Sequence, residues 1–348
     1  IQGARHGVRR PGPLPVTAAV GSRSGRSLTW PAMVLTAGIG TRLRPLSLLC
    51  AKPALPVAGV PLVGRVLRWL SASGVGSAVL NLHHLPATIT AAVGDGTGFG
   101  VQVRYSWERT LLGRAGGPAR ALPLLDADRF FVVNGDTLTD VNLVALAADH
   151  QRSGAQVTLA LVANPDPLHY GGVTVDEDGQ LTGFTPRGPA NRGLHFIGVQ
   201  AVNAEVFAPL EPDLPEETVD GIYRRMISRR PGSVRAFVSG ASFRDIGTAV
   251  DYLDTCLDIA RIENLGNCLL GRGVTVADDA HITHCVLWDD VRVGHGVTLD
   301  WSVVAAGVSI PDGACHRRSV IRPRDGRPAE PGEHAVGDLL VSPIGWRR

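Results

Sequence analysis

A glycine turn followed by two cations is the part of this sequence best suited to chemistry. Gly38 and Gly40 come directly after an apolar run, and Arg42 and Lys52 follow them. Glycines leave the backbone free to approach a ligand and to aim N–H groups at phosphate oxygens. A guanidinium and an ammonium add fixed positive charge that matches a triphosphate. The spacing therefore predicts a phosphate-binding loop.

Two aspartates further along the chain are candidate ligand-binding residues. Asp136 and Asp245 each follow an apolar run that reads as a strand. Open α/β sheets bind ligands beyond the carboxyl ends of their strands. Either aspartate alone also fits a helix cap, so a shared functional role requires that both converge on the glycine turn.

The glycine turn and the two aspartates can meet only if the strands before them belong to one fold, and the sequence predicts strands that alternate with helices. Predicted strands cover residues 32–36, 77–82, 101–106, 129–134 and 157–162, and a β-rich stretch covers 172–203. Predicted helices start near residue 63 and end near Gly74, then cover 87–93, 119–125, 143–152, 219–228 and 248–262. This alternation predicts an α/β domain over residues 33–263 with a Rossmann-like, mostly parallel sheet.

The pattern changes after residue 264. Aliphatic residues recur about every six positions over residues 264–321, with Gly, Asp or His beside many of them. A period of about six indicates a parallel β-helix, in which each flat face contributes one inward aliphatic side chain. An antiparallel sandwich would show hairpin turns instead. The sequence therefore predicts a small hexapeptide-repeat β-helix as the second domain.

The two ends of the chain differ from these domains. Residues 1–32 are rich in Gly, Pro, Ser and Arg and contain no acid, so we expect a disordered leader. Residues 322–348 are rich in Pro, Gly and charge, and we expect an irregular tail. Function is not inferred from either end.

Bulk composition excludes several classes. The chain of 348 residues is 44% hydrophobic and 19% charged with a net charge of +2, so we expect no nucleic-acid partner. No apolar run approaches the roughly 18 residues of a membrane span. The five cysteines are scattered without a CxxC pair, which favours free thiols in the cytoplasm over structural zinc.

The segment from Leu35 to Leu46, with Lys52-Pro53 and Pro56-Val57 behind it, resembles the signature of the sugar-phosphate nucleotidyltransferase family. Ser47 and Ala51 are mild departures. The resemblance implies Mg²⁺ bound by Asp136 and Asp245, and a left-handed β-helix. It implies catalytic roles for Arg42, Lys52 and Asp136. It implies nucleotide contacts at Leu35, Ala37, Gly38, Gly40 and Thr41.

Two further segments resemble the family less closely. The stretch after Glu108 resembles the family segment that contacts base and ribose, with Arg114 replacing Thr, and implies nucleotide contacts at Glu108, Gly113 and Gly116. Tyr170-Gly-Gly-Val173 resembles a sugar-contacting strand, which implies sugar contacts at Gly171 and Gly172. Arg187 is the candidate for the phosphate of the sugar. Pro186 and Phe196 replace the usual Glu and Asn, so the identity of the sugar stays open.

The resemblance implies transfer of a nucleotide from a nucleoside triphosphate to a sugar 1-phosphate with release of pyrophosphate. The base-side motif and the β-helix favour mannose-1-phosphate guanylyltransferases. Residues 81–125 also resemble uridylyltransferases of the muramic-acid type. The alternatives are a regulatory paralogue that binds sugar nucleotide without turnover, and an acyltransferase β-helix that uses His281, His284 or His295. We expect the β-helix to mediate homo-oligomer contacts.

Overall fold

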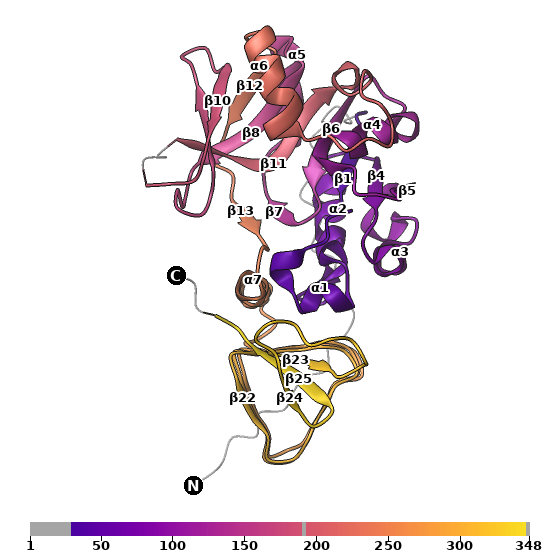
Figure 1. The fold of residues 1–348 in the computed structure, drawn as a ribbon, viewed down its shortest axis with the longest axis vertical. Coiled ribbons are helices and arrows are strands. Elements are labelled where there is room, and N and C mark those ends of the chain that lie inside the picture. Colours follow the sequence, from indigo (N-terminus) through magenta and orange to yellow (C-terminus); the bar gives the residue numbers. More distant parts are fainter. Residues whose placement is uncertain (1–28, 190–192, 346–348) are drawn as a thin grey trace.

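The computed structural model describes residues 29–189 and 193–345, which form an α/β domain and a β-helix beneath it (Figure 1). One sheet runs through the upper domain in the order β10-β9-β11-β6-β1-β4-β5, with β8 between β11 and β12. Its strands are β1 (Ala32–Leu35), β4 (Ser77–Leu82), β5 (Gln102–Trp107), β6 (Arg129–Asn134), β8 (Val157–Ala163), β9 (Gly172–Val175), β10 (Leu181–Thr185), β11 (Leu194–Asn203) and β12 (Val234–Val238).

The helices of the upper domain agree closely with the predicted ranges. They are α2 (Leu62–Ala72), α3 (Pro86–Val93), α4 (Gly113–Leu125), α5 (Leu143–Ser153), α6 (Arg224–Arg229) and α7 (Ala249–Ile262). The main difference is α4, which was expected to begin at residue 119 and begins at Gly113. A π-helical turn, η5 (Thr218–Tyr223), also precedes α6 where a single helix was expected. None of the helices among the described residues is long and apolar enough to cross a membrane.

The strand β1 lies at the centre of the sheet because its residues are apolar on both faces. It pairs in parallel with β4 and β6, and Ala32, Met33 and Val34 are completely buried. A strand covered by helices on both faces needs a continuous apolar run. Parallel pairing places the carboxyl ends of these strands, and the loops that follow them, at one edge of the sheet.

The lower domain is a parallel β-helix, as the spacing of six predicted. Its three faces are β14-β17-β20-β23, β15-β18-β21 and β16-β19-β22. Successive coils repeat at 17 residues, since Leu269 pairs with Val286, Val286 with Val303 and Val303 with Val320. The strands are β14 (Leu269–Leu270), β15 (Thr275–Val276), β16 (His281–Thr283), β17 (Val286–Leu287), β18 (Arg292–Val293), β19 (Thr298–Asp300), β20 (Val303–Val304), β21 (Ser309–Ile310), β22 (Cys315–Arg317) and β23 (Ser319–Pro323).

The expectation of an irregular tail is wrong for two short segments after residue 322. These are β24 (His334–Val336) and β25 (Leu339–Pro343), which form an antiparallel pair. The strand β25 also pairs antiparallel with β23, and its Leu339, Leu340 and Val341 are buried. This short apolar run covers the free edge of the last coil, which would otherwise expose unpaired backbone groups. Residues 346–348 lie outside the described part.

The predicted leader lies mostly outside the described residues, which begin at residue 29. Its last residues belong to the folded domain, because Trp30 is only 9% exposed. The Trp30 ring packs against Phe131 at 5.4 Å and His150 at 5.7 Å between ring centroids. The domain boundary at residue 33 is therefore a few residues too late.

Candidate active site

The glycine turn and Asp136 follow neighbouring parallel strands. The turn follows β1, and Asp136 follows β6, whose last residue Asn134 is in register with Leu35. Between them Gly135 donates its N–H to the Leu35 carbonyl oxygen at 3.0 Å. A Cβ at Gly135 would lie 2.7 Å from that oxygen, so only glycine allows the approach. The sheet therefore places the loop and the carboxylate side by side.

Asp245 reaches the same place through a second, two-stranded sheet. The strands β7 (Thr137–Thr139) and β13 (Phe243–Asp245) pair antiparallel, with Asp245 opposite Thr137. The helix that follows is capped by Thr248, which forms a capping box with Asp251. Asp245 is therefore not the cap of that helix, and Asp136 is followed by a strand. The alternative reading of both aspartates as helix caps is wrong.

Lys52 lies between the two carboxylates. Its Nζ is 2.6 Å from Asp136 Oδ2 and 3.7 Å from Asp245 Oδ1, and its side chain is only 9% exposed. Lys52 begins the 3₁₀ turn η2 (Lys52–Ala54). Gly40 packs over it, because a Cβ at Gly40 would lie 3.4 Å from the Lys52 Cβ. The structure thus brings the predicted turn, Lys52 and both aspartates together.

The electrostatics of this cluster suit a divalent cation. Burial raises the pKa of Asp245, and the negative charge of Asp136 raises it further, while Lys52 and Arg42 lower it. Two carboxylates this close compete for one ammonium, which leaves negative charge available for a metal ion. Among the described residues no group of three or more His, Cys, Asp or Glu side chains forms a cage. A two-carboxylate site instead fits a metal ion that takes its other ligands from water and phosphate.

Arg42 lies at the rim of the site on the 3₁₀ turn η1 (Thr41–Leu43). It is exposed, and its Nη1 lies 3.3 Å from the position of a Cβ at Gly247, two residues after Asp245. Gly38 is exposed, and a Cβ there would meet nothing within 4 Å. Thr41 is also exposed, whereas Ala37 is buried. The turn therefore presents open backbone and an exposed guanidinium beside the carboxylates.

A cavity of about 740 Å³ extends from this cluster across the ends of β6, β9 and β11. Its phosphate end is lined by Arg42, Asp136, Asp245 and Leu35. Its far end is lined by Tyr170, His195 and Phe243, among other residues. The volume falls within the range of pockets that hold small molecules. One cavity thus joins the predicted phosphate site to the predicted sugar site.

An aromatic cluster forms the far end. The His195 ring lies 4.5 Å from the Tyr170 ring and 5.0 Å from the Phe243 ring, measured between centroids. Its Nδ1 is 3.1 Å from the Gly171 carbonyl oxygen. Burial lowers the pKa of His195, which favours the neutral ring. Rings of this kind present apolar faces with a few polar edges, so the cluster suits the C–H faces of a sugar.

The predicted sugar-contacting residues differ in their position relative to the cavity, and their contacts with sugar stay a prediction. Gly171 and Gly172 line the cavity, whereas Arg187 is exposed and lies outside the lining. Arg114 and Arg224 line it instead, and Arg224 lies over the Phe184 ring at 5.6 Å. The buried Thr185 Oγ1, also in the lining, has no hydrogen-bond partner among the described residues. Sequence reasoning missed His195, which lies on β11, and Arg224, which is the first residue of α6 directly after η5.

The base-side residues have internal partners. The Glu108 carboxylate accepts hydrogen bonds from Asn81 Nδ2 at 2.7 Å and from the Leu112 backbone N–H at 3.0 Å. A Cβ at Gly113 would lie 2.6 Å from the Glu216 carbonyl oxygen, and one at Gly116 the same distance from that of Leu214. These residues fix the start of α4 against residues 214–217. Their predicted nucleotide contacts stay a prediction.

Two family models match the chain. The Nucleotidyl transferase model matches residues 31–261. The GlmU-like, C-terminal hexapeptide model matches residues 254–315. The two matches overlap within α7 (Ala249–Ile262), after which the β-helix begins.

Curated relatives include enzymes of two specificities. The mannose-1-phosphate guanylyltransferase of Mycobacterium tuberculosis is 30% identical over 303 residues, which cover 82% of this chain and 83% of that protein. The N-acetylmuramate alpha-1-phosphate uridylyltransferase of Neisseria meningitidis is 39% identical over 183 residues, which cover 52% of this chain and 78% of that protein.

Solved structures support the fold. HddC from Yersinia pseudotuberculosis matches with a TM-score of 0.59 at 23% identity, over 66% of this chain and 100% of that chain. The same protein has been solved in complex with GMP-PN at the same TM-score. Because the Nucleotidyl transferase model spans well over half of the sequence, and the mycobacterial relative matches along most of both chains, this chain belongs to the nucleotidyl transferase family.

Proposed function

We propose that this nucleotidyltransferase joins a nucleotide to a sugar 1-phosphate, and that its first choice of substrates is GTP and mannose 1-phosphate. The observation that carries the proposal is the position of Lys52 between Asp136 and Asp245, beside an open glycine turn and Arg42. The similarity to the mycobacterial guanylyltransferase along most of both chains supports the choice of substrates.

The reaction is an in-line displacement at the α-phosphorus of the triphosphate. A phosphate oxygen of the sugar 1-phosphate forms the new P–O bond, the bond to the bridging oxygen breaks, and pyrophosphate leaves with the electron pair. This chemistry requires positioning and charge stabilisation more than a protein nucleophile. A cavity that joins the phosphate end, with its fixed positive and negative charges, to an aromatic end provides both.

Each charged residue has a separate task. Arg42 offsets negative charge that grows on the departing pyrophosphate, and Lys52 orients the phosphates. Asp136 and Asp245 would hold Mg²⁺, which supplies Lewis-acid stabilisation of the phosphate charge when bound. The Thr185 hydroxyl and the rings of Tyr170 and His195 would orient the sugar at the far end. We place the reaction in the cytoplasm, where the five free cysteines would stay reduced.

The test is a pyrophosphate-release assay on a grid of nucleoside triphosphates and sugar 1-phosphates, with Mg²⁺ and with chelator. We expect the highest rate for GTP with mannose 1-phosphate and no rate in chelator. Release with UTP and an amino-sugar 1-phosphate would establish the second candidate, which the 39% identity to the muramate uridylyltransferase favours. Release with no pair, while sugar nucleotide still binds, would support the regulatory paralogue.

We retain the prediction that the β-helix mediates contacts between copies of the chain. Leu270 in β14 and Val276 in β15 lie on its first coil and are 38% and 37% exposed. The molar mass in solution, measured by light scattering, tests the prediction. A monomeric mass at micromolar concentration would contradict it.

A further inference from the structure

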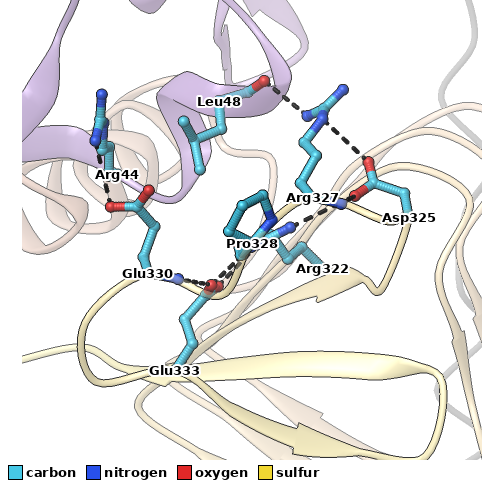
Figure 2. Close-up of polar contacts among 8 residues, drawn as sticks. All are labelled: Arg44, Leu48, Arg322, Asp325, Arg327, Pro328, Glu330 and Glu333. Atoms are coloured by element: carbon cyan, nitrogen blue, oxygen red, sulfur yellow. Dashed lines mark hydrogen bonds and ion pairs between the residues drawn. The ribbon is translucent and has the colours of Figure 1, made fainter.

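The loop between β23 and β24, residues 324–333, lies against the segment that follows Arg42; we call it the tail loop. Arg327 Nη1 donates a hydrogen bond to the Leu48 carbonyl oxygen at 2.7 Å. Arg44 Nη1 lies 3.5 Å from Glu330 Oε2. Figure 2 shows these two contacts reaching opposite ends of the same short stretch of the catalytic domain. The tail loop therefore contacts the segment of residues 44–48 at two points, one hydrogen bond and one ion pair.

The tail loop is itself held firmly. The Arg322 side chain is completely buried, and its Nε and Nη2 bond the two Glu333 carboxylate oxygens at 2.8 Å and 2.7 Å (Figure 2). Arg322 Nη2 also donates to the Pro328 carbonyl oxygen at 3.0 Å, and Glu333 Oε2 accepts from the Glu330 N–H at 2.7 Å. A bidentate pair with further hydrogen bonds fixes the geometry of a loop. The hydrogen bonds of Arg322 and Glu333 thus fix the backbone of the loop from which Arg327 and Glu330 make their contacts.

The segment that the tail loop contacts, residues 44–48, has little stability of its own. It forms α1 (Leu46–Leu49), a helix of four residues. Helices this short are marginal in water, and their last carbonyls lack partners within the helix. Arg327 supplies a partner to one of these carbonyls, at Leu48. Arg44, which contacts Glu330, lies only two residues after Arg42, whose own side chain is exposed at the rim of the site.

A second anchor holds the neighbouring segment. Trp288 Nε1 on the β-helix donates to the Tyr252 hydroxyl at 3.0 Å, and that hydroxyl donates to the Pro56 carbonyl oxygen at 2.5 Å. Leu43 and Leu46 are fully buried and belong to the same hydrophobic core as the interior of the β-helix. The β-helix therefore supports both the stretch that carries Arg42 and the stretch that follows Lys52.

We propose that Arg327 and Glu330 are positioning residues for catalysis. They hold α1, and through it the turn that carries Arg42, in the geometry that the triphosphate requires. The β-helix thereby contributes to nucleotide binding at a site to which it supplies no ligand. The kinetic part of this inference rests on the proposed function, whereas the structural part does not.

The experiment compares the double variant R327A/E330A with the matched control R324A. Arg324 is an exposed arginine of the same loop whose described hydrogen bond is made by its backbone. A charged hydrogen bond and an exposed ion pair together are worth roughly tenfold in binding. We expect the KM for the nucleoside triphosphate to rise about five- to tenfold in the double variant, with the KM for sugar 1-phosphate unchanged and the melting temperature lowered by no more than a few degrees. R327K keeps one donor and is expected to restore most of the loss.

Amide hydrogen exchange provides a readout that needs no turnover. In the double variant we expect faster exchange over residues 41–50 and unchanged exchange in β25. Unchanged exchange over residues 41–50 would overturn the proposal, as would an equal rise of KM in R324A or equal rises for both substrates. If the wild-type protein releases no pyrophosphate but exchange still rises, the proposed function fails and the support by the tail loop stands.

Discussion

The two ends of the cavity are built in different ways. The phosphate end consists of charges that the backbone fixes: Asp136 follows β6, Asp245 ends β13, and Lys52 lies between them. The aromatic end consists of side chains from three separate segments, Tyr170, His195 and Phe243, which meet only in the folded chain. The first end can be recognised from local spacing, whereas the second requires the fold. We expect the first to determine the rate and the second to determine the choice of sugar.

The largest effect is expected at the phosphate end. Asp136→Ala and Asp245→Ala each remove a carboxylate from the cluster around Lys52, and Arg42→Ala removes the cation at the rim. Loss of one electrostatic contact to a developing charge commonly costs about 10²–10³ in rate. We expect kcat for pyrophosphate release to fall at least that far in each variant, with the melting temperature within a few degrees of the wild type.

The matched control for these variants is Asp278→Ala. Asp278 is exposed on the β-helix, far along the chain from the cluster. We expect normal kcat in this variant. Near-normal turnover in Asp136→Ala would contradict the assignment of the phosphate end.

The elements that position the phosphate end could be predicted from the sequence because their signals are local. The strands at residues 77–82 and 129–134 have the predicted bounds, and a strand followed by Gly or Asp identifies a ligand-binding edge. The convergence of Asp136 and Asp245 was also expected, and the structure confirms it through Lys52. The register of β7 with β13, which produces the convergence, could not be inferred from three-residue strands.

Elsewhere long-range packing determines the structure. The sequence predicted nucleotide contacts at Gly113 and Gly116. In the structure, the small size of these two glycines allows close packing against residues 214–217. The apolar run in β25 is too short to outweigh the Pro- and Gly-rich composition around it, so the tail was expected to be irregular. His195 gave no signal, because a single histidine in a predicted strand is compatible with many roles.

An intermediate effect is expected at the aromatic end. His195→Ala removes the ring between Tyr170 and Phe243. Aromatic contacts are worth about 0.5–1.5 kcal/mol each, which corresponds to about two- to tenfold in binding. We expect the KM for sugar 1-phosphate to rise by that factor while the KM for the nucleoside triphosphate stays constant. His281→Ala, an exposed histidine of the β-helix, is the control and should change neither value. Equal rises for both substrates in His195→Ala would remove the functional distinction between the two ends.

The smallest effect on KM is expected from substitutions of two arginines near the predicted sugar site. Arg224 lines the cavity, 5.6 Å from the Phe184 ring and 3.4 Å from Asp220, whereas Arg187 is exposed outside the lining. Exposed cation–π and ion-pair contacts are worth up to about 1 kcal/mol, or about fivefold. We therefore expect Arg224→Ala to raise the KM for sugar 1-phosphate about two- to fivefold, and Arg187→Ala to change it less than twofold. Steady-state kinetics at low ionic strength, where exposed charges are least screened, measures both. A larger effect at Arg187 would place the phosphate of the sugar on the loop that the sequence suggested, and the aromatic end would then extend beyond the present cavity.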